Sequence, residues 1–167
     1  MTYKEMRKEK DIRFFVDTVE TLAKEVNIEA MNEYTQHGNT ACLTHCLAVA
    51  YLSYSFARKL KLKVDYTSLI RGAVLHDYFL YDWHDTNTRF THGFTHPQTA
   101  YEKASLEVAL NSIEENIIKR HMFPLTLIPP KTKEAAVVCL LDKYCAIAEL
   151  TSQEYYVRVL PQIHFAS

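Results

Sequence analysis

The sequence predicts an all-α protein, and three observations support this prediction. Only three of the 167 residues are glycines, so few tight hairpin turns are expected. Apolar residues recur at nearly helical spacing through most of the chain, and the sustained alternation typical of half-buried strands is scarce. With 48% hydrophobic and 23% charged residues, the composition is that of a compact globular protein. We therefore expect a single domain over residues 1–167, built as a bundle of about six to seven helices.

The first two predicted helices precede the middle of the chain. The first covers residues 10–34, where apolar side chains such as Phe15, Val19 and Leu22 form one stripe. A short segment with a glycine ends it. The second helix begins near Thr40 and is apolar on more than one face, which predicts a central position in the bundle.

The third helix and the segment after it contain the most polar part of the sequence. Asp65 suits the N-cap of this helix, which runs to the adjacent pair His76 and Asp77. Residues 81–96 are polar and aromatic without helical periodicity, so we expect a lid or a wall of a site. Pro97 suits the first position of a fourth helix.

Two further helices are predicted in the last third of the chain. Ser112 and Glu115 fit a capping box that begins the fifth helix, which ends near His121. A connector with three prolines follows, and Thr132 can then cap a long apolar sixth helix. Residues 151–160 predict a short amphipathic helix near the C-terminus.

Histidine and aspartate residues in these helices are of the kinds that bind a catalytic metal ion. Neutral imidazole supplies nitrogen donors, and a carboxylate supplies a charged oxygen that can bridge two ions. Asp142 is the most informative, because a carboxylate in so apolar a helix would cost several kcal/mol if it were buried without a partner. In chain order the candidates are His45, His76, Asp77, His96, His121 and Asp142.

The order of these residues resembles that of the HD-domain metal-dependent phosphohydrolases. Their pattern is a histidine on one helix, an adjacent His-Asp pair on the next and a late aspartate. The corresponding segments here are THCLAVA, RGAVLHDYFLYDW and CLLDKYCA, so the resemblance covers about residues 40–150. It implies that His45, His76, Asp77 and Asp142 bind a first ion.

Two more histidines resemble the additional ligands of family members that carry two ions. They lie in THGFTHPQTA and IKRHMFPL, and the resemblance implies that His96 and His121 bind a second ion while Asp77 bridges both. His92 precedes His96 by four residues and could take its place, although the motif position favours His96. Members that act on cyclic dinucleotides carry a Gly-Tyr-Pro signature, which is absent from this sequence, so cyclic di-GMP is not the expected substrate.

Resemblance and donor chemistry imply the same reaction. A divalent ion lowers the pKa of bound water, and the resulting metal-bound hydroxide would attack phosphorus in a phosphoester or phosphoanhydride. Histidine-rich ligation favours iron or manganese over magnesium, with one or two ions bound. The resemblance implies a small phosphorylated substrate, a nucleotide in the first instance, with diadenosine polyphosphates or alarmones as the alternative. Besides Asp77, we expect Lys143 to contact the phosphate and Asp82 to position water or transfer a proton.

Two interpretations without catalysis remain open. The chain could retain its metal and bind a nucleotide as a regulatory protein without turnover. Alternatively, it could be a helical interaction module that binds no metal, in which case Asp142 would pair with a cation such as Arg71.

Charge and termini restrict the expected partners. The net charge is −1 and the basic residues are scattered, so no long nucleic acid is expected as a partner. No stretch approaches the ~20 apolar residues of a membrane helix, and the charged N-terminus does not resemble a signal peptide. We therefore expect a cytoplasmic protein without a membrane partner and with reduced cysteines. A homodimer is compatible with the sequence.

Overall fold

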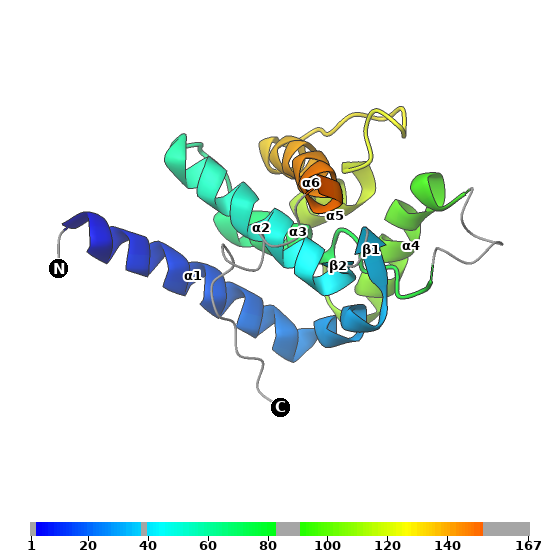
Figure 1. The fold of residues 1–167 in the computed structure, drawn as a ribbon, viewed down its shortest axis with the longest axis horizontal. Helices are drawn as coiled ribbons and strands as arrows, with labels where there is room; N and C mark the ends of the chain where they lie inside the picture. Colours follow the sequence, from blue (N-terminus) through cyan, green and yellow to red (C-terminus); the bar gives the residue numbers. More distant parts are fainter. Residues whose placement is uncertain (1–2, 38–39, 83–90, 152–167) are drawn as a thin grey trace.

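The computed structural model describes residues 3–37, 40–82 and 91–151. This part of the chain contains six α-helices, one 3-10 helix and one pair of very short strands, which confirms the all-α class (Figure 1). The predicted C-terminal helix lies beyond Thr151, outside the described residues. No helix in the described part is both long enough and apolar enough to cross a membrane. The α-helices are α1 (Tyr3–Glu25), α2 (Cys42–Lys59), α3 (Tyr66–Leu75), α4 (His92–Glu107), α5 (Ser112–Arg120) and α6 (Lys133–Thr151).

The first predicted helix is in fact two elements. After α1, the 3-10 helix η1 covers Ile28–Glu33, and Asn27 between them has a non-helical backbone. The N–H of Asn27 donates to Glu107, and its carbonyl accepts a hydrogen bond from the Tyr78 hydroxyl. Tertiary contacts thus satisfy backbone groups that a continuous helix would have paired internally. The prediction of one continuous helix here is wrong.

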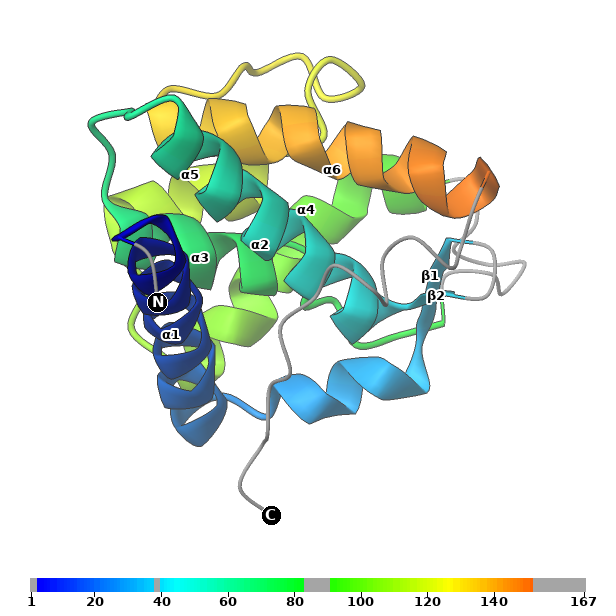
Figure 2. The ribbon, with the colours of Figure 1, turned by 60° about the vertical axis from the view of Figure 1, so that its left-hand side comes forward.

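A small antiparallel strand pair leads into the central helix. The strands are β1 (Thr35–His37) and β2 (Thr40–Ala41), which the sequence did not predict. α2 begins within two residues of its predicted start and is buried on more than one face. It packs against both α3 and α6, and so lies in the middle of the bundle as its apolar pattern predicts (Figure 2).

Side-chain caps determine where three of the helices begin. The Asp65 side chain accepts the backbone N–H of Ser68 at the start of α3, as predicted. At the start of α6 the Thr132 hydroxyl accepts a backbone N–H from the first turn, also as predicted. The capping box of α5 is one residue earlier than predicted, because Asn111 is the N-cap and Glu114 completes the box.

The fourth helix begins earlier than predicted. α4 starts at His92, so the end of the supposed loop is helical and Pro97 lies inside the helix. The Thr91 carbonyl accepts two backbone N–H groups of the first turn, which establishes the helix before the proline is reached. Pro97 has no N–H to donate, so the helix loses one internal hydrogen bond there. The middle of the predicted wall segment, residues 83–90, lies outside the described residues.

α3 and α5 approach each other closely at Gly72, and this contact yields a stability prediction. A Cβ at Gly72 would lie 2.6 Å from Cδ1 of Ile117 and 3.3 Å from Cα of Glu114. We expect Gly72→Ala to lower the free energy of unfolding by ~1–3 kcal/mol, because the α5 backbone would have to move. Since α3 and α5 end at His76 and His121, the same change should displace two predicted ligands.

Urea unfolding would measure this loss, and Gly93→Ala is a matched control. A Cβ at Gly93 would meet only the flexible ends of Leu125 and Met122, at 2.9 Å and 3.8 Å, so a smaller effect is expected. Equal unfolding midpoints for Gly72→Ala and the unmodified protein would contradict the close contact between α3 and α5.

Candidate metal centre

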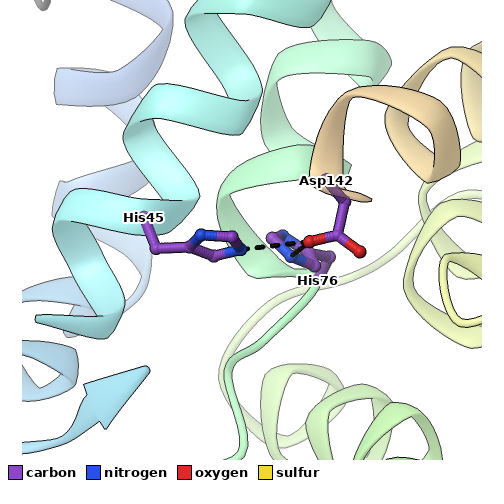
Figure 3. Close-up of side chains that lie close together, drawn as sticks. All are labelled: His45, His76 and Asp142. Atoms are coloured by element: carbon purple, nitrogen blue, oxygen red, sulfur yellow. Dashed lines mark hydrogen bonds and ion pairs between the residues drawn. The ribbon is translucent and has the colours of Figure 1, made fainter. Parts of the chain in front are cut away.

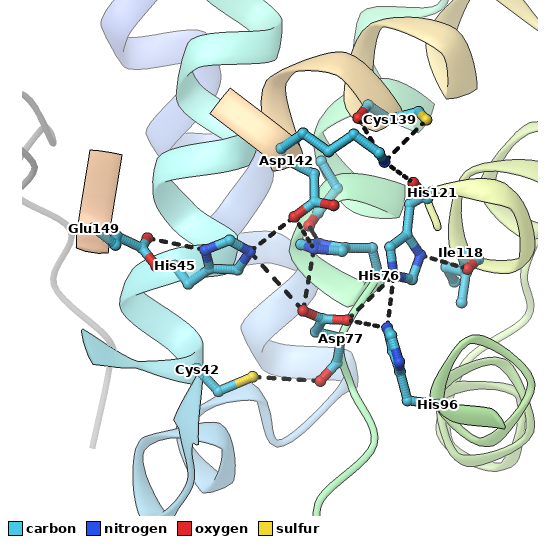
Figure 4. A network of polar contacts seen from close by, with 12 residues as sticks. Cys42, His45, His76, Asp77, His96, Ile118, His121, Cys139, Asp142 and Glu149 are labelled. Atoms are coloured by element: carbon cyan, nitrogen blue, oxygen red, sulfur yellow. Dashed lines mark hydrogen bonds and ion pairs between the residues drawn. The ribbon is translucent and has the colours of Figure 1, made fainter. Parts of the chain in front are cut away.

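The structure brings all six predicted ligand residues together in the centre of the bundle (Figure 4). Each of them is at most 7% exposed. Five helices position them, and two of the ligands, His76 and His121, are the residues that cap α3 and α5 at their C-terminal ends. The contributions are His45 from α2, His76 and Asp77 at and after the end of α3, His96 from α4, His121 at the end of α5 and Asp142 from α6.

Asp77 lies between two pairs of imidazole nitrogens. Its Oδ1 is 3.1 Å from Nε2 of His96 and 3.4 Å from Nε2 of His121. Its Oδ2 is 3.3 Å from Nε2 of His76 and 3.9 Å from Nε2 of His45. The two carboxylate oxygens therefore face different pairs of histidines, which is the arrangement by which one carboxylate can bridge two ions.

Asp142 faces the first of these pairs. Its Oδ1 lies 3.1 Å from Nε2 of His45 and 3.5 Å from Nε2 of His76 (Figure 3). The donor atoms of these three residues lie within 4.8 Å of one another. Asp77 and the other two histidines form a second group of the same kind. Two adjacent groups of donors, with Asp77 between them, match the division that the resemblance implies.

Each of the four histidines directs its Nδ1 away from the cluster, toward an acceptor. A ring that donates through Nδ1–H keeps the lone pair on Nε2 for a metal ion. For three of the rings the acceptor is a backbone carbonyl at 2.7–2.8 Å: Ala73 for His76, His92 for His96 and Ile118 for His121.

The donor atoms fit a divalent cation. The Nε2 atoms of His96 and His121 are 2.8 Å apart, and two lone pairs at that distance repel unless a proton or a cation lies between them. The buried Nε2 of His76 has no hydrogen-bond partner among the described residues. Imidazole nitrogens with carboxylate oxygens are the ligand types that suit iron, manganese or zinc.

Glu149 is a functional residue that the sequence did not reveal. Its Oε1 accepts a hydrogen bond from Nδ1 of His45 at 2.9 Å, and the residue is 1% exposed. It follows Asp142 by seven residues, two turns of α6, so both side chains lie on the same face. A second acidic residue at that spacing in an apolar helix is the signal that could have found it.

We expect Glu149→Gln to weaken metal binding by ~10–100-fold, the range for residues that orient metal ligands. Glutamine can still accept the hydrogen bond from His45, but it lacks the charge that raises the basicity of the ring. Competition with a chromogenic chelator would measure the affinity. Glu102→Gln, an exposed change on α4, serves as the control. Equal affinities for Glu149→Gln and the unmodified protein would show that Glu149 does not tune the site.

The charges in the cluster keep its carboxylates ionised. Burial alone would raise the pKa of Asp77, but the charges of His76 and His96 hold it well below the usual value. Burial also opposes ionisation of Asp142, and the neighbouring His45 and His76 lower its pKa. For His45 burial lowers the pKa, yet hydrogen bonds to two carboxylates raise it to about 10.

Cys46 also lies within ligand distance of His76 and Asp77. Burial and the neighbouring Cys42 raise the pKa of its thiol well above the usual value, so the thiolate that a metal requires is disfavoured. All four cysteines are buried, and none of them forms a disulfide.

A cavity of about 500 Å³ opens beside the second group of ligands. Candidate ligand residues and apolar residues both line it, and the sequence did not single out the apolar ones. The described lining residues are Asp77, His92, His96, His121, Met122, Pro124, Leu125, Asp142, Lys143 and Ala146.

The two other predicted catalytic residues differ in their positions. Lys143 lines the cavity, and its Nζ donates to the carbonyls of His121 and Cys139 at 2.7 Å and 3.2 Å. Asp82 is exposed and is not one of the described residues that line the cavity. Its role in proton transfer or water positioning stays a prediction.

His92 lies beside the cluster but outside the two groups of metal-compatible donors. Its ring stacks on that of His96 with centroids 4.4 Å apart, and its Nδ1 is hydrogen-bonded to the Tyr81 hydroxyl at 2.8 Å. Of the two alternatives in this segment, the structure places His96 in a metal-compatible group with Asp77.

The pairing of Asp142 with Arg71, which a metal-free interaction module would require, is wrong. Arg71 forms ion pairs with Glu25 and Glu114 at 2.9 Å and 2.7 Å. Asp142 instead faces the histidine cluster.

A comparison with known protein families identifies the same segment of the chain as the one that forms the candidate metal centre. The sequence model of the HD domain matches residues 42–147, a span that contains all six ligand positions. No curated protein and no solved structure matches the chain. The matched segment is more than half of the chain, and the chain therefore belongs to the HD-domain family, a superfamily of metal-dependent phosphohydrolases.

Proposed function

We propose that this protein hydrolyses a phosphoester or phosphoanhydride bond in a small phosphorylated molecule, using two divalent ions held by the buried cluster. The observation that carries the proposal is the position of Asp77, whose two oxygens face two different pairs of histidine nitrogens. When bound, the ions lower the pKa of water and polarise the phosphoryl oxygens. Iron or manganese suits the four imidazoles better than magnesium does.

The residues of the chain have separate tasks in this proposal. Asp77 would hold both ions, one through each carboxylate oxygen, while the Nδ1 acceptors hold each ring with its Nε2 toward the cluster. Lys143 supplies positive charge beside the phosphate from its position on the cavity wall. The burial of the cluster excludes bulk water, which strengthens these electrostatic interactions.

A nucleotide is the substrate that family membership suggests first, with diadenosine polyphosphates or alarmones as the alternative. A protein that retains the metal and binds a nucleotide without turnover would use the same residues. The presence of the whole donor set together with an adjacent cavity supports an enzyme over a protein without turnover.

The test is elemental analysis of protein purified without chelators or affinity-tag metal, followed by assays for phosphate release. About two equivalents of iron or manganese, with phosphate release from at least one ester, would support the proposal. Bound metal without turnover on nucleotides, diadenosine tetraphosphate or aryl phosphates would favour the regulatory protein. No metal after reconstitution would contradict the proposal.

A further inference from the structure

We infer that the substrate is a phosphate monoester whose leaving group is uncharged and largely apolar, and that polyphosphates are poor substrates. The inference rests on the proposed function, because it concerns the cavity next to the same metal centre. It is carried by the contrast between the candidate ligand residues and the apolar residues that line this cavity.

The candidate ligand residues in the cavity lining suit one phosphoryl group. Asp77, His96, His121 and Asp142 line it, and these residues belong to the two donor groups. Lys143 is the only lysine or arginine among the described lining residues. Two backbone carbonyls already accept hydrogen bonds from its Nζ, so its capacity for further phosphates is small.

Four of the described lining residues are apolar. Met122, Pro124 and Leu125 follow α5, and Ala146 lies on α6. A volume of about 500 Å³ suits a small ligand with one ring or a short chain beyond its phosphate. Removing the apolar surface of such a leaving group from water would favour binding.

Leu125 is held close to the ligand-bearing end of α4. A Cβ at position 93 would lie 2.9 Å from Cδ2 of Leu125, so this side chain lies directly against Gly93 in the first turn of the helix. His96, which is three residues further along α4, lines the same cavity. A phosphate at His96 would therefore lie in the same cavity as the Leu125 side chain.

Among the described lining residues, the apolar ones offer no side-chain donor to a second or third phosphate. Each added phosphate brings further negative charge, and burying it without a partner is costly. Another cation on α5, Lys119, pairs with Glu115 at 2.9 Å, and its Nζ lies 3.6 Å from the centre of the Tyr101 ring. Lys119 is not among the described residues of the cavity lining.

Binding of two non-hydrolysable probes tests the inference without requiring turnover. Phenylphosphonate and methylphosphonate share the same head group and differ in apolar surface. We expect calorimetry on the metal-loaded protein to show roughly tenfold tighter binding of phenylphosphonate, because its ring is removed from water. Equal affinities, or tighter binding of inorganic triphosphate than of phenylphosphonate, would overturn the inference.

A charge among the apolar lining residues should change the substrate preference. We expect Leu125→Lys to lower kcat/KM for phenyl phosphate by roughly tenfold and to raise it for diadenosine tetraphosphate, because a cation replaces apolar surface. Leu127→Lys is the matched control: Leu127 is 88% exposed and is not one of the described cavity residues. The control should leave both values unchanged.

The two proposals fail in different ways. If the metal-loaded protein releases phosphate from no ester, the proposed function fails, while the phosphonate affinities still decide which ligand class the cavity prefers. If the protein hydrolyses diadenosine tetraphosphate at least as efficiently as phenyl phosphate, the function stands and the inference is wrong. An unchanged ratio of the two substrates in Leu125→Lys would also overturn it.

Discussion

Asp77→Asn is expected to abolish phosphate release and to lower the metal affinity by more than ~100-fold. That is the upper end of the loss seen when a residue that only orients a ligand is replaced. Asparagine has nearly the shape of aspartate, but it is neutral and offers only one oxygen. It therefore cannot bridge two positions, and it leaves the surrounding imidazoles without the negative charge that they face. The change acts on both donor groups at once, because the Asp77 side chain faces histidines of each.

Elemental analysis and phosphate release, with circular dichroism to verify folding, would measure this result. Asp17→Asn, an exposed change on α1, removes the same charge away from the site and should retain activity. A folded Asp77→Asn protein with two bound ions or with full activity would exclude Asp77 as the bridging ligand.

His96→Ala and His121→Ala are each expected to reduce bound metal from about two equivalents to about one. Each change removes one Nε2 donor from the second group, whereas His45, His76 and Asp142 keep the first group intact. Activity should fall with the lost ion, because one ion cannot stabilise both the attacking and the leaving oxygen. Metal analysis per folded chain measures the result.

His92→Ala provides the control and also decides between the two histidines of this segment. Alanine keeps the backbone carbonyl that accepts the hydrogen bond from Nδ1 of His96. The His92→Ala protein should therefore still bind two equivalents of metal. Loss of one equivalent in His92→Ala, with none lost in His96→Ala, would assign the ligand to His92 and contradict the structure.

Local signals in the sequence predicted several helix boundaries correctly. Asp65 and Thr132 cap their helices through hydrogen bonds that span only three residues, so the sequence around them contains both partners. The break at Asn27 depends on contacts with Glu107 and Tyr78, which lie 80 and 51 residues away. Such partners cannot be identified from neighbouring residues.

The start of α4 illustrates a different limit. Pro97 is common at the first position of a helix, and the sequence therefore suggested that the helix begins there. The earlier turn forms nonetheless, and it places His92 and His96 on one face, where their rings stack. A preference for one position is only a weak guide when tertiary contacts favour a longer helix.

The types and order of residues in the sequence determined the helical class, the six candidate ligands and the family, because patterning and donor chemistry are properties of the chain itself. Only the tertiary structure decided that the oxygens of Asp77 face separate histidine pairs and that Glu149 accepts a hydrogen bond from His45. It also decided that apolar residues line the cavity beside the candidate ligands. These features depend on distances between side chains from different helices, and such distances are set by how the helices pack, as α3 and α5 do at Gly72.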